Sequence, residues 1–73
     1  MKGKEQIIGK IMRATKKAFL VRVDMGHRFG SRLAWTEDIW FPRSQVEVED
    51  AQTETGYRYI HVPFWLTKAR GLR

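Results

Sequence analysis

The chain contains no cysteine, and only two of its 73 residues are histidine. Without cysteine it can form neither a disulfide framework nor a zinc site with thiolate ligands. Two histidines alone are too few for a structural metal site. We therefore expect no cofactor and no bound metal, and the composition suits the reducing cytoplasm.

Long hydrophobic runs are also missing. No apolar stretch approaches the roughly 20 residues that span a bilayer. The polar start at residues 1–6 precedes no hydrophobic region of signal-peptide length. We expect a soluble, unprocessed cytoplasmic protein with no membrane partner. Residues 1–73 make a single domain, near the lower size limit for a core that folds unaided.

The residue combinations that catalysis needs are not found in the sequence. There is no Gly-x-Ser-x-Gly turn, and His27 and His61 lie 34 residues apart. Glu37 and Asp38 are neighbours on a predicted strand, so their side chains point to opposite faces. A domain this small also leaves little room for a substrate cleft. These observations predict a protein that is not an enzyme and has no small-molecule substrate.

Acidic residues are scarce in the first half of the chain. Residues 1–34 contain nine Lys/Arg and two acidic residues, whereas residues 35–56 contain six acidic residues and one arginine. Residues 57–73 are basic again, and the whole chain carries a net charge of +6. Two outcomes stay open. Folding either leaves a basic face and an acidic face, or interleaves the segments and dilutes both.

Alternating apolar residues predict a series of β-strands. Residues 6–13 and 18–24 are the first two, joined by a hairpin connection at residues 14–17. Gly9 lies inside the first strand and indicates a bend or close backbone approach, as at a barrel corner. Residues 57–62 form the last strand, after an acidic segment that we expect to be a solvated loop at residues 49–56.

The stretch around Pro42 organises the rest of the prediction. Trp40 and Phe41 suit a half-buried strand, and Pro42 must end or bulge the ladder because it has no N–H. A strand resumes with Val46 and Val48. Residues 63–71 then predict a short helix, in which Trp65, Leu66 and Ala69 form an apolar stripe that plugs the end of a barrel. Together the elements predict a mainly all-β fold, a small five-stranded SH3/OB-like barrel with a short C-terminal helix.

Basic and aromatic side chains are interleaved, which is the pattern expected of nucleic-acid grooves on small barrels. The candidate contacts are Lys10, Arg13, Lys16, Lys17, Arg22, Arg28, Phe29, Arg32, Trp40, Arg43, Tyr57, Arg58, Tyr59 and His61. Tyr57, Tyr59 and His61 share a strand face, which is a stacking platform if exposed and a second core face if buried.

Two parts of this candidate surface have ordinary structural interpretations as well. Lys16 and Lys17 at a hairpin tip either face phosphates or are simply solvated. Residues 25–34 place Phe29 between Gly26 and Gly30. Such a loop either stacks a base or is a plain connection with Phe29 against the core.

Several motifs resemble a group of small uncharacterised proteins, often phage-encoded. The shared features are a Trp-x-Pro-[Lys/Arg]-Ser-Gln corner, here Trp40 to Gln45, and a Val-Pro-x-Trp-Leu segment, here Val62 to Leu66. Ala14-Thr15, Lys17-Ala18-x-Leu20-Val21 and Arg70-Gly71-Leu72 also match. The resemblance covers most of the chain except residues 25–36, where this chain is longer. It implies a compact β-fold in a phage or bacterial setting and carries no established activity.

Two functions from different classes follow from these features. The first is a non-enzymatic barrel that binds nucleic acid, single-stranded rather than duplex, as a phage-type accessory protein. The second is a phage-encoded protein–protein interaction module that inhibits or redirects a host enzyme complex. Both place the protein in the bacterial host cytoplasm, and the same exposed aromatics support either one.

Overall fold

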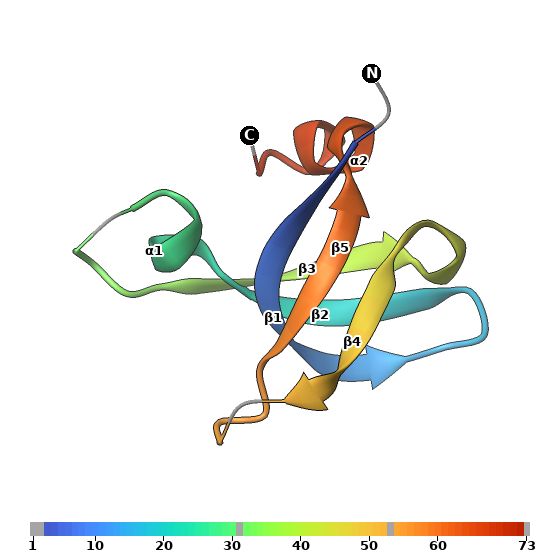
Figure 1. Ribbon diagram of the computed structural model, residues 1–73, viewed down its shortest axis with the longest axis horizontal. Coiled ribbons are helices and arrows are strands. Elements are labelled where there is room, and N and C mark those ends of the chain that lie inside the picture. Colours follow the sequence, from blue (N-terminus) through green and yellow to red (C-terminus); the bar gives the residue numbers. More distant parts are fainter. Residues whose placement is uncertain (1–2, 31, 53, 73) are drawn as a thin grey trace.

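The computed structural model describes residues 3–30, 32–52 and 54–72, with the backbone alone at residues 27, 28, 51 and 52. Five strands carry most of the chain (Figure 1). They are β1 (Lys4–Ala14), β2 (Ala18–Asp24), β3 (Thr36–Pro42), β4 (Glu47–Gln52) and β5 (Arg58–Pro63). The helical elements are α1 (Met25–Arg28), the 3-10 turn η1 (Arg43–Gln45) and α2 (Phe64–Ala69).

All five strands belong to one antiparallel sheet, in the order β3-β2-β1-β5-β4. The two edge strands, β3 and β4, follow one another in the chain and are joined through η1. The predicted β-rich class, the five strands and the C-terminal helix are therefore confirmed. Among the described residues no ladder joins β3 to β4, so the sheet is open in its hydrogen bonding.

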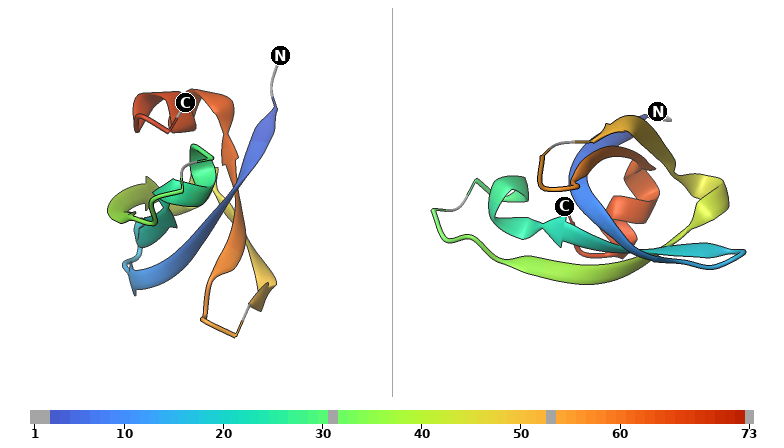
Figure 2. Two further views of the ribbon diagram at one scale, coloured as in Figure 1. Left: turned by 90° about the vertical axis from the view of Figure 1, so that its left-hand side faces the viewer. Right: turned by 90° about the horizontal axis from the view of Figure 1, so that it is seen from below.

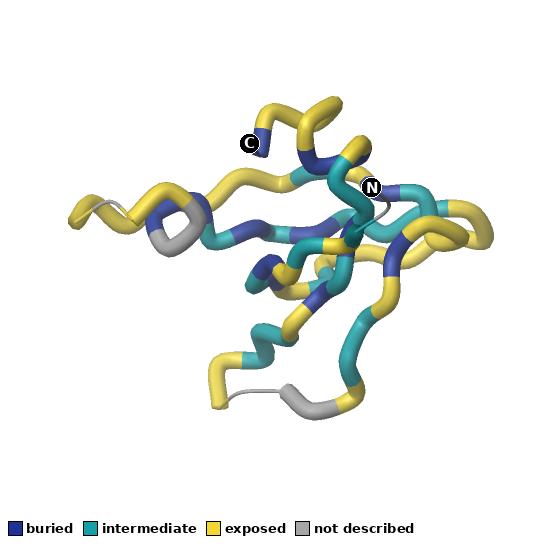
Figure 3. The backbone as a smooth tube through the Cα atoms, turned by 45° about the horizontal axis from the view of Figure 1, so that its top comes forward, coloured by how far each residue is buried: buried dark blue, intermediate teal, exposed yellow. Residues whose placement is uncertain are grey.

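The sheet is strongly curved, and α2 lies at one end of its concave side (Figure 2). Alternate residues of β1, β2, β3 and β5 face this side, as their period-2 patterns require. The buried hydrophobic core consists of Ile7, Val21, Val23, Met25, Phe41, Val46, Ile60, Val62, Leu66 and Leu72. Figure 3 shows these buried positions alternating with more exposed ones along the strands.

Gly9 has the role that its place in the first strand predicts. A Cβ atom there would lie 2.4 Å from Cγ1 of Val21 and 3.3 Å from the carbonyl oxygen of Arg22. Strands β1 and β2 thus approach each other too closely for a side chain at this position. A register shift between Ile11 and Arg13 follows two residues further on and adds to the bend.

The C-terminal helix is shorter than predicted, and its expected apolar stripe is wrong. Pro63 ends β5, so α2 begins at Phe64, and Trp65 is 58% exposed rather than buried. Gly71 has φ +76°, a left-handed conformation that suits glycine and turns the chain back. Leu72 N–H then donates to the Thr67 carbonyl at 2.8 Å, and Leu72 enters the core beside Leu66. The end of the concave side is filled by Leu66 and Leu72.

Two connections differ from the prediction, because backbone hydrogen bonds to distant segments determine their structure and the local composition does not. The acidic segment expected to be a loop from residue 49 continues β4 to Gln52, since it pairs with β5. The segment expected to be irregular begins with α1. The N–H groups of Met25 and Gly26 both donate to the Trp35 carbonyl, at 3.0 and 3.3 Å, and this closes the base of the connection.

Candidate nucleic-acid interface

The turn between β1 and β2 is fixed by hydrogen bonds at the tip where two predicted contacts lie. Thr15 N–H donates to the Ala18 carbonyl at 2.8 Å, and the Thr15 hydroxyl oxygen accepts from Ala18 N–H at 3.0 Å. The Lys17 carbonyl accepts from Arg43 N–H at 2.8 Å, which ties the tip to η1. Lys16 and Lys17 are exposed on this fixed turn.

Arg43 is the third cation at this end, and its position is set by two contacts. Its Nη1 donates to the Thr15 carbonyl at 2.7 Å. Its guanidinium carbon lies 4.6 Å from the centroid of the Phe19 ring, within the range of a cation–π interaction. A guanidinium has five N–H donors, so donors remain for a further acceptor.

These cations line a cavity of about 380 Å³. Its lining residues are Lys16, Lys17, Pro42, Arg43 and Ser44. Three of these described lining residues are cationic and none is acidic. Such an arrangement attracts an anion of phosphate size, an attraction that salt screens. We call Lys16, Lys17, Arg43 and Ser44 the hairpin-end cluster.

Exposed Trp40 lies near the hairpin-end cluster. It is 44% exposed on the convex face of β3, opposite Leu20 of β2. Leu20 in turn pairs with Arg13 at the end of β1. A row of Arg13, Leu20 and Trp40 therefore crosses three strands at the end of the sheet that carries the cluster. An indole beside phosphate-binding groups is suited to stacking on a base.

Tyr59 and His61 of β5, and Tyr57 just before that strand, lie on the convex side of the sheet and do not form a second core face. Tyr59 is exposed, and Tyr57 and His61 are half-buried. His61 Nε2 lies 2.6 Å from a carboxylate oxygen of Glu49, and the Gln6 side-chain amide donates to the same oxygen at 3.4 Å. The edge of the His61 ring is thus engaged within the protein.

Folding interleaves the basic and acidic segments where strands pair. Arg22 Nε and Nη2 donate to the two carboxylate oxygens of Asp38 at 2.9 and 3.2 Å. This hydrogen bond lowers the pKa of Asp38 below its ordinary value and raises the pKa of Arg22. Nζ of Lys4 on β1 lies 3.6 Å from a carboxylate oxygen of Glu47 on β4. Of the two outcomes that the sequence left open, these pairs favour interleaving.

The remaining predicted contacts lie elsewhere. Phe29 and Arg32 are exposed on the connection from α1 to β3, at the opposite end of β2 from the hairpin (Figure 1). The side chain of Arg28 lies outside the described residues. Lys10 and Arg58 line a separate cavity of about 520 Å³ with Asp50, and Arg58 donates to the Glu49 carbonyl at 3.4 Å. The predicted residues therefore form several groups.

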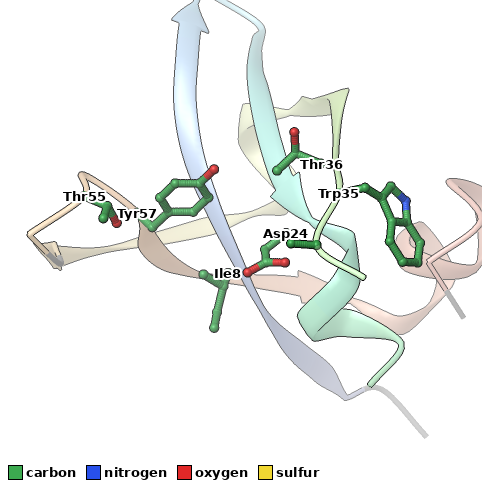
Figure 4. A pocket seen from close by; sticks show the side chains of 7 residues that line it. Ile8, Asp24, Trp35, Thr36, Thr55 and Tyr57 are labelled. Carbon is green, nitrogen blue, oxygen red and sulfur yellow. The ribbon is translucent and has the colours of Figure 1, made fainter. Parts of the chain in front are cut away.

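A third hollow, which the sequence did not indicate, lies on the convex face. It has a volume of about 570 Å³, and its lining residues are Ile8, Asp24, Ala34, Trp35, Thr36, Thr55 and Tyr57 (Figure 4). We call it the Asp24 groove. Of its residues, Tyr57 and Trp35 are aromatic side chains that the sequence marks as candidates for stacking on a base. The only other feature of the sequence that could have pointed to this groove is Asp24, an isolated acidic residue in the basic first half of the chain.

The described residues offer no candidate for a metal site or a membrane-spanning helix. Within the part of the chain that the structure describes, no group of three or more His, Asp or Glu residues could hold a metal ion. No helix among those residues is long and apolar enough to cross a membrane. No family model, curated protein or solved structure was found to match this chain.

Proposed function

We propose that the protein is a non-enzymatic small barrel that binds single-stranded nucleic acid, as a phage-type accessory protein in the bacterial cytoplasm. The observation that carries the proposal is the hairpin-end cluster, where Lys16, Lys17 and Arg43 line one cavity and no acid is found among its described lining residues. Phosphate neutralisation by such groups supplies most of the affinity of sequence-independent binders.

Single strands are favoured over duplex because of the aromatic side chains nearby. Trp40 and Tyr59 are exposed on the convex face, where an unpaired base can stack on them. Stacking contributes about 1–3 kcal/mol per base and requires bases that are free of a duplex. The curved sheet, with its two edge strands joined through η1, supports a barrel architecture of the kind that presents such surfaces.

The proposal is tested by the salt dependence of oligonucleotide binding, followed by fluorescence anisotropy. The double variant Lys16→Ala/Lys17→Ala removes two phosphate contacts. It should weaken binding and reduce the slope of log K against log salt by about 1.4, since each single-strand phosphate contributes about 0.7.

The matched control removes two positive charges elsewhere. Lys4→Ala/Lys68→Ala changes Lys4, which pairs with Glu47, and Lys68, which is exposed on α2. This control should keep the wild-type slope. Failure of the wild-type protein to bind any oligonucleotide at low salt would remove the proposal. If both double variants lost the same binding affinity, the net charge of the protein would explain binding and the hairpin-end cluster would not.

A protein–protein module remains the second candidate, and one observation favours it. Phe29, Leu33 and Trp35 are all exposed large hydrophobic residues on the connection from α1 to β3. Exposed apolar side chains that gather on one segment are typical of interaction sites. A host-lysate pull-down with and without nuclease discriminates the two functions. A partner retained after nuclease, and lost on Phe29→Ser/Leu33→Ser, would favour the module.

A further inference from the structure

The Asp24 groove is lined by acidic, aromatic and aliphatic side chains from four separate chain segments. Strand β1 contributes Ile8, and the ends of β2 and the following connection contribute Asp24 and Trp35. Tyr57 comes from the segment just before β5. In Figure 4 the Asp24 side chain lies between Tyr57 on one side and Trp35 on the other, next to Ile8. The groove therefore offers a carboxylate among flat and aliphatic apolar groups.

Asp24 is the one acidic residue among the described groove residues. A carboxylate has two oxygens and about four acceptor sites, so it can accept two parallel N–H donors in addition to its contacts within the protein. The groove's aromatic side chains, Trp35 and Tyr57, suit a flat partner. A matching ligand thus has a planar ring with two adjacent N–H donors on one edge.

A positively charged side chain lies close to the groove. Lys10 follows the groove residue Ile8 by two positions on β1, and its aliphatic stem lies beside Gly56 (3.5 Å from the position of a Cβ atom there). Arg22, two positions before Asp24 on β2, is paired with Asp38, so its charge is balanced within the protein. A cationic peptide drawn to Asp24 would meet Lys10 in a chain of net charge +6, whereas a nucleotide brings an anion to it.

We propose that the Asp24 groove is a base-recognition pocket that selects guanine in the bound strand. Guanine presents its N1–H and its exocyclic amino group side by side on its Watson–Crick edge, and one carboxylate accepts from both. Proteins commonly recognise single strands by hydrogen bonds to this edge together with stacking. This inference rests on the proposed nucleic-acid binding and adds base selectivity to it.

The test compares three oligonucleotides of about 15 nucleotides. The first is oligothymidylate, the second has one central deoxyguanosine, and the third has deoxyinosine there, which lacks only the exocyclic amino group. The wild-type protein should bind the guanine oligonucleotide at least about fivefold more tightly than either of the others. This comparison uses the unmodified protein, so it does not depend on a variant that folds.

The variant Asp24→Asn should abolish the guanine preference while its affinity for oligothymidylate is kept or slightly raised. Asn is chosen because Asp24 directly precedes α1, a position where Asn and Asp are comparably favourable. The matched control is Glu37→Gln, which removes the same charge. Glu37 pairs with Val23 of the core, so it lies on the opposite side of the sheet from Asp24. The control should keep the preference.

The failures of the two proposals are distinguishable. Salt-dependent binding of all three oligonucleotides with equal affinity overturns guanine selection and leaves nucleic-acid binding intact. No binding to any of them at low salt overturns both. Competition by an oligolysine peptide that disappears in Asp24→Asn also overturns guanine selection, because it assigns the groove to a cationic protein partner.

Discussion

At the scale of single residues, the contacts of a charged group within the protein decide whether its charge is available to a ligand. Arg22 and Arg43 have the same side chain. Arg22 donates two hydrogen bonds to the Asp38 carboxylate, whereas Arg43 donates to a neutral carbonyl and packs on a ring. The charge of Arg22 is therefore balanced locally, and that of Arg43 is not. Only the second arrangement leaves a net positive field for a phosphate.

The Arg22–Asp38 pair predicts a measurable titration. The hydrogen bond from Arg22 holds the pKa of Asp38 below its ordinary value, so Arg22→Ala should raise this pKa towards that ordinary value. A carboxyl whose pKa is lowered by folding stabilises the native state above its unfolded pKa. That contribution is lost as the pH falls through the folded pKa. NMR titration of the Asp38 side chain in the wild type and in Arg22→Ala measures the shift, and an unchanged pKa in Arg22→Ala would contradict it.

The sequence identifies residue types for binding more readily than it identifies groupings. Lys16, Lys17 and Arg43 were candidates from their charge alone. They share a cavity because the Ala18–Pro42 register brings the hairpin to η1. The Asp24 groove needs contacts between residues far apart in the chain, such as Ile8 and Tyr57. No local pattern encodes such contacts, so the groove could not be predicted.

At the scale of elements, local periodicity predicts the strands because burial of one sheet face imposes it. The pattern of β2, with Val21 and Val23 fully buried, is the clearest instance. The sequence did not predict that β4 continues to Gln52. The length of β4 is determined by pairing with β5, and the acidic composition of this segment gives no sign of that pairing. α1 was missed because four residues are too few to show a helical period.

Two substitutions in the C-terminal segment test which residues stabilise the fold. One changes a residue of the apolar stripe expected from the sequence, and the other changes a residue of the observed core. Leu72 is 1% exposed and enters the core after the turn at Gly71, so Leu72→Ala should destabilise the fold by about 2–4 kcal/mol. Trp65→Ala should cost less than about 1 kcal/mol because the ring is largely exposed. Urea denaturation monitored by far-UV circular dichroism measures both. The reverse order would restore Trp65 as the residue that fills the end of the sheet.

At the scale of the whole molecule, the net charge acts over distances comparable to the protein itself. The extents are 32 × 28 × 19 Å. The Debye length is about 30 Å at 0.01 M salt and about 8 Å at 0.15 M. At low salt every charge therefore interacts with every other, and the net +6 repels itself. At physiological salt mainly near neighbours such as Arg22 and Asp38 still interact.

Salt should accordingly have opposite effects on folding and on binding. Raising salt from about 0.01 to 0.15 M screens the self-repulsion that disfavours the compact state. The gain should be on the order of 0.5 kcal/mol, or about 2–4 °C in Tm for a domain of this size. Over the same range oligonucleotide affinity should fall, because releasing each counterion from the nucleic acid is less favourable when the bulk salt is more concentrated. Differential scanning calorimetry and anisotropy in matched buffers measure the two effects. A Tm that falls with salt would mean that the local pairs, Arg22–Asp38 and Lys4–Glu47, outweigh the net charge.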